Sequence, residues 1–265
     1  MSSQQRPILP QLKQLAPHFI QREIRSRYLG SLSGLAWAFI HPLAQLALYA
    51  TVFVYIFGAR IPEAESVGFV AYVGIAFWAW LMFSDGVNRA LPAIIENTSL
   101  IAKVALPAEI LVIAAVTGTL LLHLAGYALV LILLAATGTQ LHLAGLVGVL
   151  PVLMMLAALT LGSGLILAAC QVFIRDLAQV VQQVLTFGFF LTPILYSRAM
   201  LPEFAQKLMG LNPLTYYPER LRSLFLQGDI APGMHDLYAL LTALVVLTIG
   251  MWLFRRLAPH FEDFL

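Results

Sequence analysis

Long uncharged apolar runs alternate with short polar segments along the whole chain. A helix that crosses a bilayer needs about 20 consecutive, mostly apolar residues. By that measure the sequence predicts six spans, at residues 34–57, 67–88, 109–136, 143–172, 177–197 and 237–254. The uncharged interval from Ile110 to Ile174 holds two of them, separated by the turn-forming residues 137–140. The pattern therefore predicts an all-α membrane protein with one transmembrane domain over residues 1–265.

Three segments do not fit simple spans. Residues 17–29 begin at Pro17, a favourable first helical residue, and alternate apolar with basic positions, which predicts an amphipathic helix at the cytoplasmic interface. Residues 97–106 predict a short cytoplasmic helix between the second and third spans. Residues 198–232 include a run that is too apolar for a free loop and too short to span. This run favours a re-entrant helical hairpin on the periplasmic side, between the fifth and sixth spans.

Composition removes the soluble classes of protein. The chain is 60% hydrophobic and 11% charged, whereas an average soluble domain has roughly 25% charged residues. The net charge of +2 is small and the basic residues are scattered, so nucleic acid is not an expected partner. Residues 1–27 are polar and show no cleavage pattern, so we expect internal helices, in contact with membrane lipid, to anchor the chain.

The distribution of lysine and arginine predicts the orientation. If the N-terminus is cytoplasmic, ten basic residues fall in inside segments and five in outside segments. The inside set is Arg6, Lys13, Arg22, Arg25, Arg27, Arg89, Lys103, Arg175, Arg255 and Arg256; the outside set is Arg60, Arg198, Lys207, Arg220 and Arg222. Because cytoplasmic loops carry the excess of positive charge, both termini are predicted to be inside.

The usual catalytic signatures are missing from the sequence. There is no Gly-x-x-x-x-Gly-Lys loop for phosphate, and the six histidines show no metal-ligand spacing. Cys170 is the only cysteine, so neither a disulfide nor a cysteine metal site is expected. We therefore expect no catalytic residue, metal or cofactor in this chain. A membrane-embedded glycosyl- or acyltransferase would need acids and histidines that the spans lack.

Two spans carry polar and aromatic faces. At 100° per residue, one third of the first span holds Trp37, His41, Gln45, Tyr49 and Tyr55, and one face of the fifth span holds Gln179, Gln182, Gln183, Thr186 and Phe190. Such faces should not point at lipid. For any single residue, interhelical hydrogen bonding is the favoured explanation. Both faces together favour a channel lining. A wall of aromatic and amide side chains would suit a glycan, because a sugar ring has an apolar C–H face and a rim of hydroxyls. With so few polar positions in one chain, we expect a homodimer that encloses one pathway.

Four motifs, in order, suggest a family. They are Arg22-Glu-Ile-Arg25-Ser-Arg-Tyr-Leu-Gly-Ser31 followed by Gly34, Trp37 and Pro42; Lys103 to Glu109; Phe173 to Leu177 followed by Thr192 to Tyr196; and Asn212-Pro213-Leu214 to Glu219 and Arg222. Together they resemble type 2 ABC exporter permeases for polysaccharides, the exporters of O-antigen, capsule and teichoic acid. The resemblance covers nearly the whole chain, and the order and spacing of the motifs are more specific than any one motif.

The resemblance implies a function and a set of partners. It implies a permease subunit in the bacterial inner membrane, which moves lipid-linked polysaccharide from cytoplasm to periplasm. Two copies of a separate nucleotide-binding ATPase subunit would bind ATP and Mg and hydrolyse the ATP. Coupling to that subunit is assigned to Arg22, Arg25, Glu96, Lys103 and Glu109, and the periplasmic hairpin to Asn212, Pro213, Glu219 and Arg222. Two of these roles have simpler structural alternatives. The basic helix could only anchor the chain at the membrane interface, and Glu109 could only stabilise the N-terminus of its helix by its negative charge. An exporter of small drugs or lipids and a purely structural subunit are the other functions considered.

Overall fold

The computed structural model describes residues 8–28, 34–58, 61–64, 67–103 and 107–264, with the backbone alone for residues 8–14, 27–28 and 102–103. Within these ranges all regular structure is helical, and there is no strand. The α-helices are α1 (Ile8–Tyr28), α2 (Gly34–Ala50), α3 (Phe69–Ala90), α4 (Thr98–Lys103), α5 (Glu109–Ala136), α6 (Gly145–Phe173), α7 (Leu177–Leu191), α8 (Glu203–Gly210), α9 (Tyr216–Arg222) and α10 (Met234–Leu257). Short 3₁₀ and π-helices are η1 (Thr51–Ile56), η2 (Pro62–Ala64), η3 (Ile95–Asn97), η4 (Arg198–Met200), η5 (Pro213–Thr215), η6 (Ser223–Gln227) and η7 (Ala258–Asp263).

Five helices in the described ranges are long and apolar enough to cross a membrane. They cover Gly34–Ile56, Phe69–Ala90, Glu109–Ala136, Gly145–Phe173 and Met234–Asp263. The sixth apolar helix, α7, has only 15 residues, or roughly 22 Å at 1.5 Å per residue, which is shorter than a hydrocarbon core of about 30 Å. The count of six crossings therefore stays a prediction. It requires the residues that follow α7, up to 197, to complete the fifth crossing.

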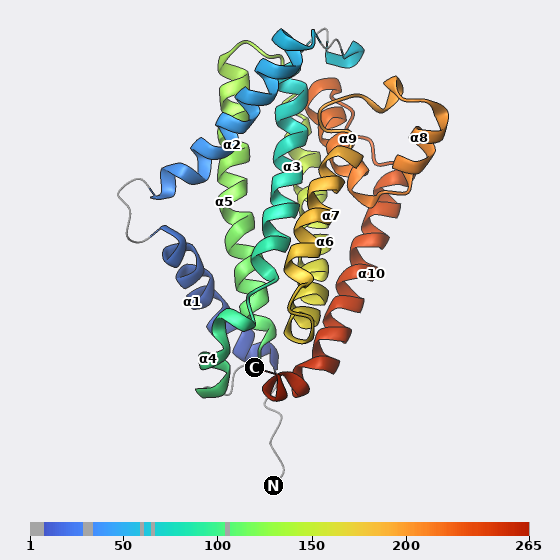
Figure 1. The fold of residues 1–265 in the computed structure, drawn as a ribbon. Helices are drawn as coiled ribbons and strands as arrows, with labels where there is room; N and C mark the ends of the chain where they lie inside the picture. The colour runs from blue at the N-terminus through green and yellow to red at the C-terminus, as the bar shows by residue number, and fades with distance from the viewer. Residues whose placement is uncertain (1–7, 29–33, 59–60, 65–66, 104–106, 265) are drawn as a thin grey trace.

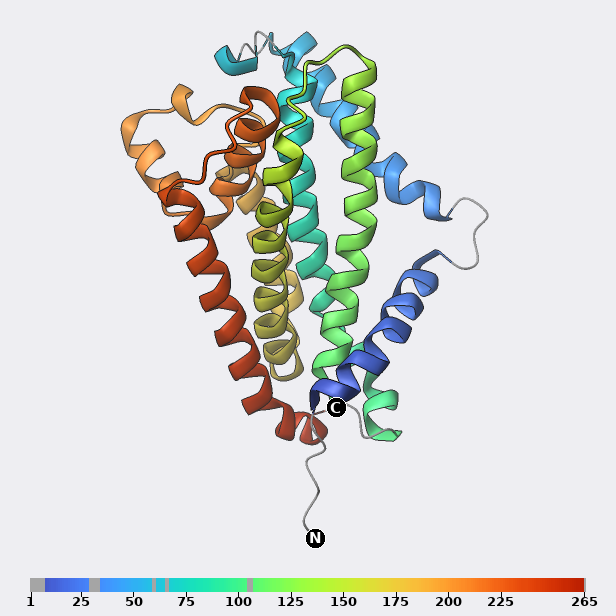
Figure 2. The same ribbon diagram turned by 180° about the vertical axis from the view of Figure 1, so that it is seen from behind.

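The helices run lengthwise and alternate in direction (Figures 1 and 2). Helices α2, α5 and α7 run away from the end that carries the two termini, and α3, α6 and α10 run back towards it. We call this the terminal end; α8 and α9 lie at the opposite end, which we call the hairpin end. This alternation places both termini at the same end.

The helix within the fifth predicted span, 177–197, is shorter than the span. The helix stops at Leu191, and Thr192 is extended, with φ −107° and ψ 134°. Pro193 explains the stop, because a proline ring clashes with a preceding residue in helical conformation. The bent segment that follows carries the backbone carbonyls of Pro193 and Ile194, which accept hydrogen bonds from a buried arginine.

The three irregular segments also differ in detail from the predictions. Helix α1 begins at Ile8 rather than at Pro17, so Pro17 lies inside a helix whose remaining hydrogen bonds hold it together. Within 97–106, helix α4 ends at Lys103, and residues 104–106 lie outside the described residues. Residues 198–232 form several short helices broken at Asn212. Whether they dip into the membrane, and whether α1 lies at its interface, stay predictions.

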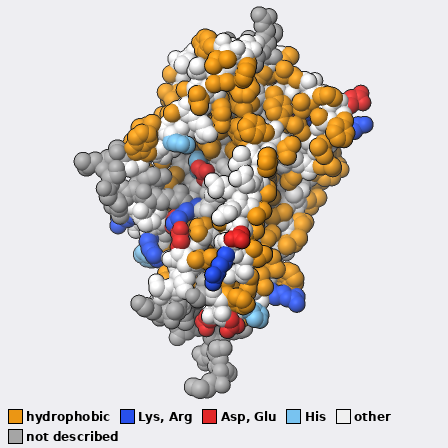
Figure 3. Space-filling view, viewed as in Figure 1, with side chains coloured by type: hydrophobic (Ala, Val, Ile, Leu, Met, Phe, Trp, Pro, Cys, Tyr) orange, Lys and Arg blue, Asp and Glu red, His pale blue; other side chains and the backbone are white. Residues whose placement is uncertain are grey.

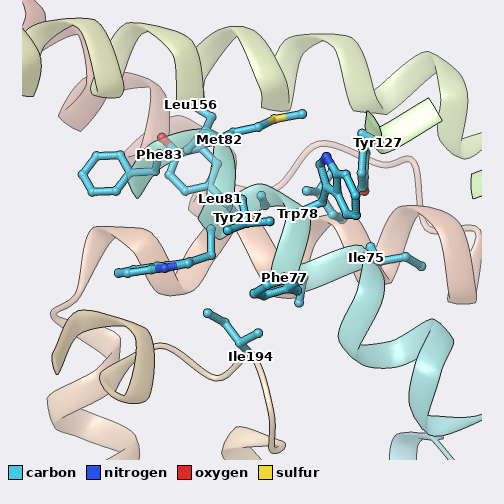
Figure 4. Packing of buried hydrophobic residues seen from close by; sticks show 14 of the residues in the cluster. Ile75, Phe77, Trp78, Leu81, Met82, Phe83, Tyr127, Leu156, Ile194 and Tyr217 are labelled. Carbon is cyan, nitrogen blue, oxygen red and sulfur yellow. The ribbon is translucent and has the colours of Figure 1, made fainter. Parts of the chain in front are cut away.

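Helix α3 is the centre of the bundle. In its most apolar stretch 78% of the residues are buried, whereas in the helix that begins at Gly34 the share is 11%. Trp78 is fully buried and its indole N–H donates to the backbone oxygen of His123 on α5, at 3.0 Å. Around it lie Phe77, Tyr127 and Tyr217, so that one cluster joins α3, α5 and α9 (Figure 4). The first span is thus peripheral and the second is the core.

Helices α6 and α10 approach each other most closely at two glycines. A Cβ added at Gly250 would lie 2.4 Å from the backbone oxygen of Gly162, so neither position can hold a larger side chain without separating the helices. Small residues at such a crossing let two helix backbones pack closely. On the face drawn in Figure 3, hydrophobic side chains cover the half towards the hairpin end, and charged ones gather in the half towards the termini.

Candidate functional site

The polar and aromatic residues predicted on the first span lie on α2 and η1. Trp37 is 57% exposed and Tyr55 is 83% exposed, and His41 is exposed as well. Gln45 and Tyr49 are half-buried, and the Gln45 side-chain amide donates to the Tyr49 hydroxyl at 3.1 Å. Since Tyr55 belongs to a π-helical turn, it does not follow the α-helical spacing that the sequence analysis assumed.

An aromatic cluster joins α2 to α3 and α7. The Tyr49 ring stacks on Phe189 at 5.6 Å between ring centroids and meets Phe77 edge-on at 5.6 Å. The ring centroids of Trp80 and Phe189 lie 5.9 Å apart, and those of Phe189 and Phe190 lie 5.2 Å apart. Because Phe190 is 58% exposed, the cluster reaches from the interior of the bundle to its surface. The Tyr49–Phe189 stack therefore joins the predicted face of the first span to the buried side of α7.

Helix α7 turns its amide face outward. Its buried side consists of Val181, Leu185 and Phe189, and its exposed side includes Gln179, Gln182, Gln183, Thr186 and Phe190. Amide side chains in a hydrocarbon environment are costly unless they find partners. The outward glutamines are therefore expected to face another protein chain or water.

A polar network lies at the terminal end. Arg89 at the end of α3 forms a two-pronged ion pair with Glu23 of α1 and also contacts Glu96 at 3.0 Å. Beside it, the Arg22 guanidinium donates to Asn97 at 3.1 Å. These contacts join α1 to the end of α3 and to η3. A cavity of about 210 Å³ lies among these side chains, close to α5.

The remaining coupling candidates have different surroundings. Glu109 is buried at the start of α5 and its carboxylate lies 3.4 Å from the Arg255 side chain of α10. Arg25 is exposed on α1. The side chain of Lys103 lies outside what the structure describes. The structure thus brings Arg22 and Glu96 into one network and places Glu109 with α10.

Arg222 is the most deeply buried charge at the hairpin end. Its side chain donates to three backbone carbonyls: that of Tyr72 at 2.9 Å, Pro193 at 2.7 Å and Ile194 at 2.6 Å. The guanidinium carbon also lies 3.5 Å from the centroid of the Tyr72 ring. Burial lowers the pKa of Arg222 to about 10, with the neighbouring Tyr72 and Glu219 opposing that change, so the group stays protonated at neutral pH. One side chain thus fastens α9 to α3 and to the segment after α7.

The other hairpin candidates stabilise the local turns. The Asn212 side chain accepts from the Leu214 amide at 3.0 Å and donates to Thr192 at 3.1 Å, and Pro213 begins η5. Glu219 lies 3.8 Å from Arg198. Burial raises the pKa of Glu219, and the nearby arginines oppose that change. All four predicted residues therefore take part in the hairpin, but not at a single point.

Sequence reasoning missed Glu23 and Asn97 as partners in the network at the terminal end. Arg89 counted only towards the charge bias, yet it lies at the centre of this network. Sixty-six positions separate Glu23 from Arg89, so no local spacing could have linked them. Only the packing of α1 on α5 and the end of α3 brings the two side chains together.

Comparison with known proteins identifies similar chains. The sequence pattern of the ABC-2 type transporter family matches residues 17–226. The chain is 32% identical over 244 residues to the O-antigen export system permease protein RfbA of Myxococcus xanthus, covering 90% of both chains. It is 23% identical to the protein of the same name from Klebsiella pneumoniae, with 92% of both chains covered. It is 25% identical to the polysialic acid transport protein KpsM of Escherichia coli, over 88% of this chain and 90% of that relative.

Proposed function

The chain belongs to the ABC-2 type transporter family, and on this premise we propose that it is the membrane-spanning subunit of an ATP-driven exporter. The cargo is lipid-linked polysaccharide of the O-antigen type, which moves from the cytoplasmic to the periplasmic side of the bacterial inner membrane. The relatives that carry O-antigen export and polysialic acid transport in their names support this substrate class. The terminal end is cytoplasmic and the hairpin end periplasmic, in keeping with the excess of basic residues near the termini.

One observation carries the proposal most directly: α2 and α7 both carry exposed aromatic and polar side chains, and the Tyr49–Phe189 stack holds the two helices together. A homodimer that brings two such faces together encloses them away from lipid. Flat rings then contact the C–H faces of sugars, and the amides exchange hydrogen bonds with hydroxyls. Such a surface is better suited to a long polymer, which must slide along it, than to a small ligand, which must be held tightly.

The function is tested by deleting the chain from its host and restoring it. We expect loss of surface polysaccharide in the deletion strain, accumulation of lipid-linked polysaccharide on the cytoplasmic side, and recovery when the intact chain is returned. The measurements are surface polysaccharide by gel and antibody, and the lipid-linked pool by extraction. Normal surface polysaccharide with increased drug sensitivity would instead identify a small-molecule exporter.

Two copies of a separate ATPase subunit supply the energy, and ATP and Mg bind to that subunit. Its contact with this chain includes α1, η3 and α4, because Arg89 joins α1 to η3 and α4 follows η3 directly in the chain. Movement of α4 is passed to α3 through Glu96 and to α1 through Asn97.

Charge reversal at this joint should uncouple the two subunits. We expect Glu96→Arg to lower substrate-stimulated ATP hydrolysis of the purified complex about threefold, because it replaces an attraction to Arg89 with repulsion while leaving the spans intact. Glu203→Arg is the matched control, since Glu203 is an exposed acid on α8 at the opposite end. Equal stimulation in both variants would count against this network as the joint.

A further inference from the structure

The carboxylate of Asp85 lies within the membrane-spanning part of the bundle. Asp85 is residue 17 of the 22 in α3, and its partner His123 is residue 15 of the 28 in α5. Neither belongs to the last turn of its helix. Ionisable groups at such positions are rare, because a charge that faces lipid inside the bilayer is costly.

The histidine is held firmly in place. Its Nε2 atom lies 3.0 Å from the Asp85 Oδ2 atom, and the residue is only 8% exposed. Trp78 holds the backbone of His123 from the other side, at 3.0 Å. Gly126, one turn further along α5, gives the Trp78 ring its space, since a Cβ there would lie 2.5 Å from the ring.

The aspartate, in contrast, is open. Its side chain is 48% exposed while that of His123 is 10% exposed, and its second carboxylate oxygen accepts no hydrogen bond from any of the described residues. The next turn of α3 continues the polar surface with Asn88, which is exposed, and Arg89. If Asp85 served only to join α3 to α5, one carboxylate oxygen would be enough, and the helices would cover the whole carboxylate. The open half of this carboxylate therefore faces water or another polar group rather than lipid.

The depth of Asp85 matches the amide face of α7. Helices α3 and α7 run in opposite directions, and Trp80 lies against Gly188, where a Cβ would be 2.9 Å from the ring. Since both helices rise by the same distance per residue, five residues further along α3 correspond to five residues back along α7. Asp85 is thus at the level of Gln183, one of the outward glutamines.

We propose that Asp85 lines the water-filled part of the pathway within the membrane and accepts hydrogen bonds from hydroxyl groups of the passing polysaccharide. His123 is a positioning residue that holds one carboxylate oxygen and leaves the other free. The inference rests on the proposed function for the identity of the ligand, but the exposure of Asp85 to water does not. It adds α3 to the pathway, which the sequence analysis assigned to the first and fifth spans alone.

Water access is tested by cysteine labelling of the full chain with its ATPase in lipid nanodiscs. The single native cysteine is first removed as Cys170→Ser. Asp85→Cys is then compared with Val245→Cys, because Val245 is 54% exposed at the middle of α10, among apolar neighbours. With a charged methanethiosulfonate reagent, we expect the cysteine at 85 to react at least tenfold faster. Equal, slow rates at both positions would overturn the proposal.

Hydroxyl binding is tested separately by surface polysaccharide in cells. We expect Asp85→Asn to keep at least half of the wild-type export, Asp85→Leu to lose at least tenfold, and His123→Gln to lose severalfold, all at equal membrane levels. Normal export by the leucine variant would overturn the binding role, even with fast labelling. If the leucine variant does not accumulate, the asparagine variant decides, and its failure at normal levels overturns the proposal. If the wild-type chain itself restores no polysaccharide, the proposed function fails, while the labelling result still answers the question of access.

Discussion

Replacement of Arg222 by leucine is expected to cause the largest loss of folded protein of any single change in this chain. The leucine leaves the Pro193 and Ile194 carbonyls buried without their donor. The Tyr72 carbonyl also loses this bond, although it lies within a helix that can satisfy it. Each buried unsatisfied group costs about 1–3 kcal/mol, so two cost on the order of 2–6 kcal/mol. For a chain of this size that corresponds to a fall in Tm of roughly 5–20 °C.

The measurement is thermal unfolding of detergent-solubilised protein, followed by size-exclusion chromatography. Arg198→Leu is the matched control, since Arg198 is 38% exposed and its ion-pair partner Glu219 lies 3.8 Å away. We expect it to shift Tm by no more than a few degrees. Arg222→Lys should fall between the two, because an ammonium group donates hydrogen bonds but cannot span three carbonyls as a guanidinium does. A Tm for Arg222→Leu equal to that of the control would contradict the assignment.

Removal of two exposed rings from the pathway should reduce export more than any single change in it. Trp37 and Phe190 are 57% and 58% exposed, on α2 and α7. Loss of one aromatic contact costs about 1 kcal/mol, or roughly fivefold in rate. We expect Trp37→Ala and Phe190→Ala each to slow export by about that factor. Because a polymer contacts both positions at once, the double variant should be slower by at least about 25-fold.

The measurement is surface polysaccharide at matched protein levels. Trp252→Ala serves as the control, because Trp252 is 56% exposed on α10, where its ring lies 5.3 Å from the Arg256 guanidinium. We expect normal export from it. Leucine at both 37 and 190 should keep the fold but not the transport, since leucine has no flat face. Wild-type export by the double leucine variant would show that these rings only pack against the partner chain, and that the pathway lies elsewhere.

Much of the architecture could be predicted because hydropathy is local. The apolar runs that begin near Gly34, Glu109 and Gly145 coincide with helices, since each run is long, uncharged and ended by a polar turn. The family could also be predicted, because its motifs are short and lie in a fixed order, and the comparison with known proteins confirms it. The absence of a phosphate-binding loop needed no structure either.

Other features could not be predicted because they depend on how the helices pack. Hydropathy ranks the first and second spans alike, yet only α3 lies at the centre, where Trp78 fits against Gly126. The predicted end of the fifth span ignored the effect of Pro193 on the residue before it. The polar and aromatic faces could be recognised on each helix alone, but the contact between α2 and α7 through Tyr49 and Phe189 could not.

The sequence by itself therefore determined that the chain spans a membrane, that it belongs to a family of transporters and which helices carry polar faces, because each of these is written in runs of neighbouring residues. Only the tertiary structure decided how the charges are neutralised. Arg89 with Glu23, Arg222 with Pro193 and His123 with Asp85 lie 29 to 66 positions apart. A charge in an apolar environment needs a partner within hydrogen-bond distance, and in a bundle of long helices that partner comes from whichever helix packs beside it, not from the residues next to it in the chain.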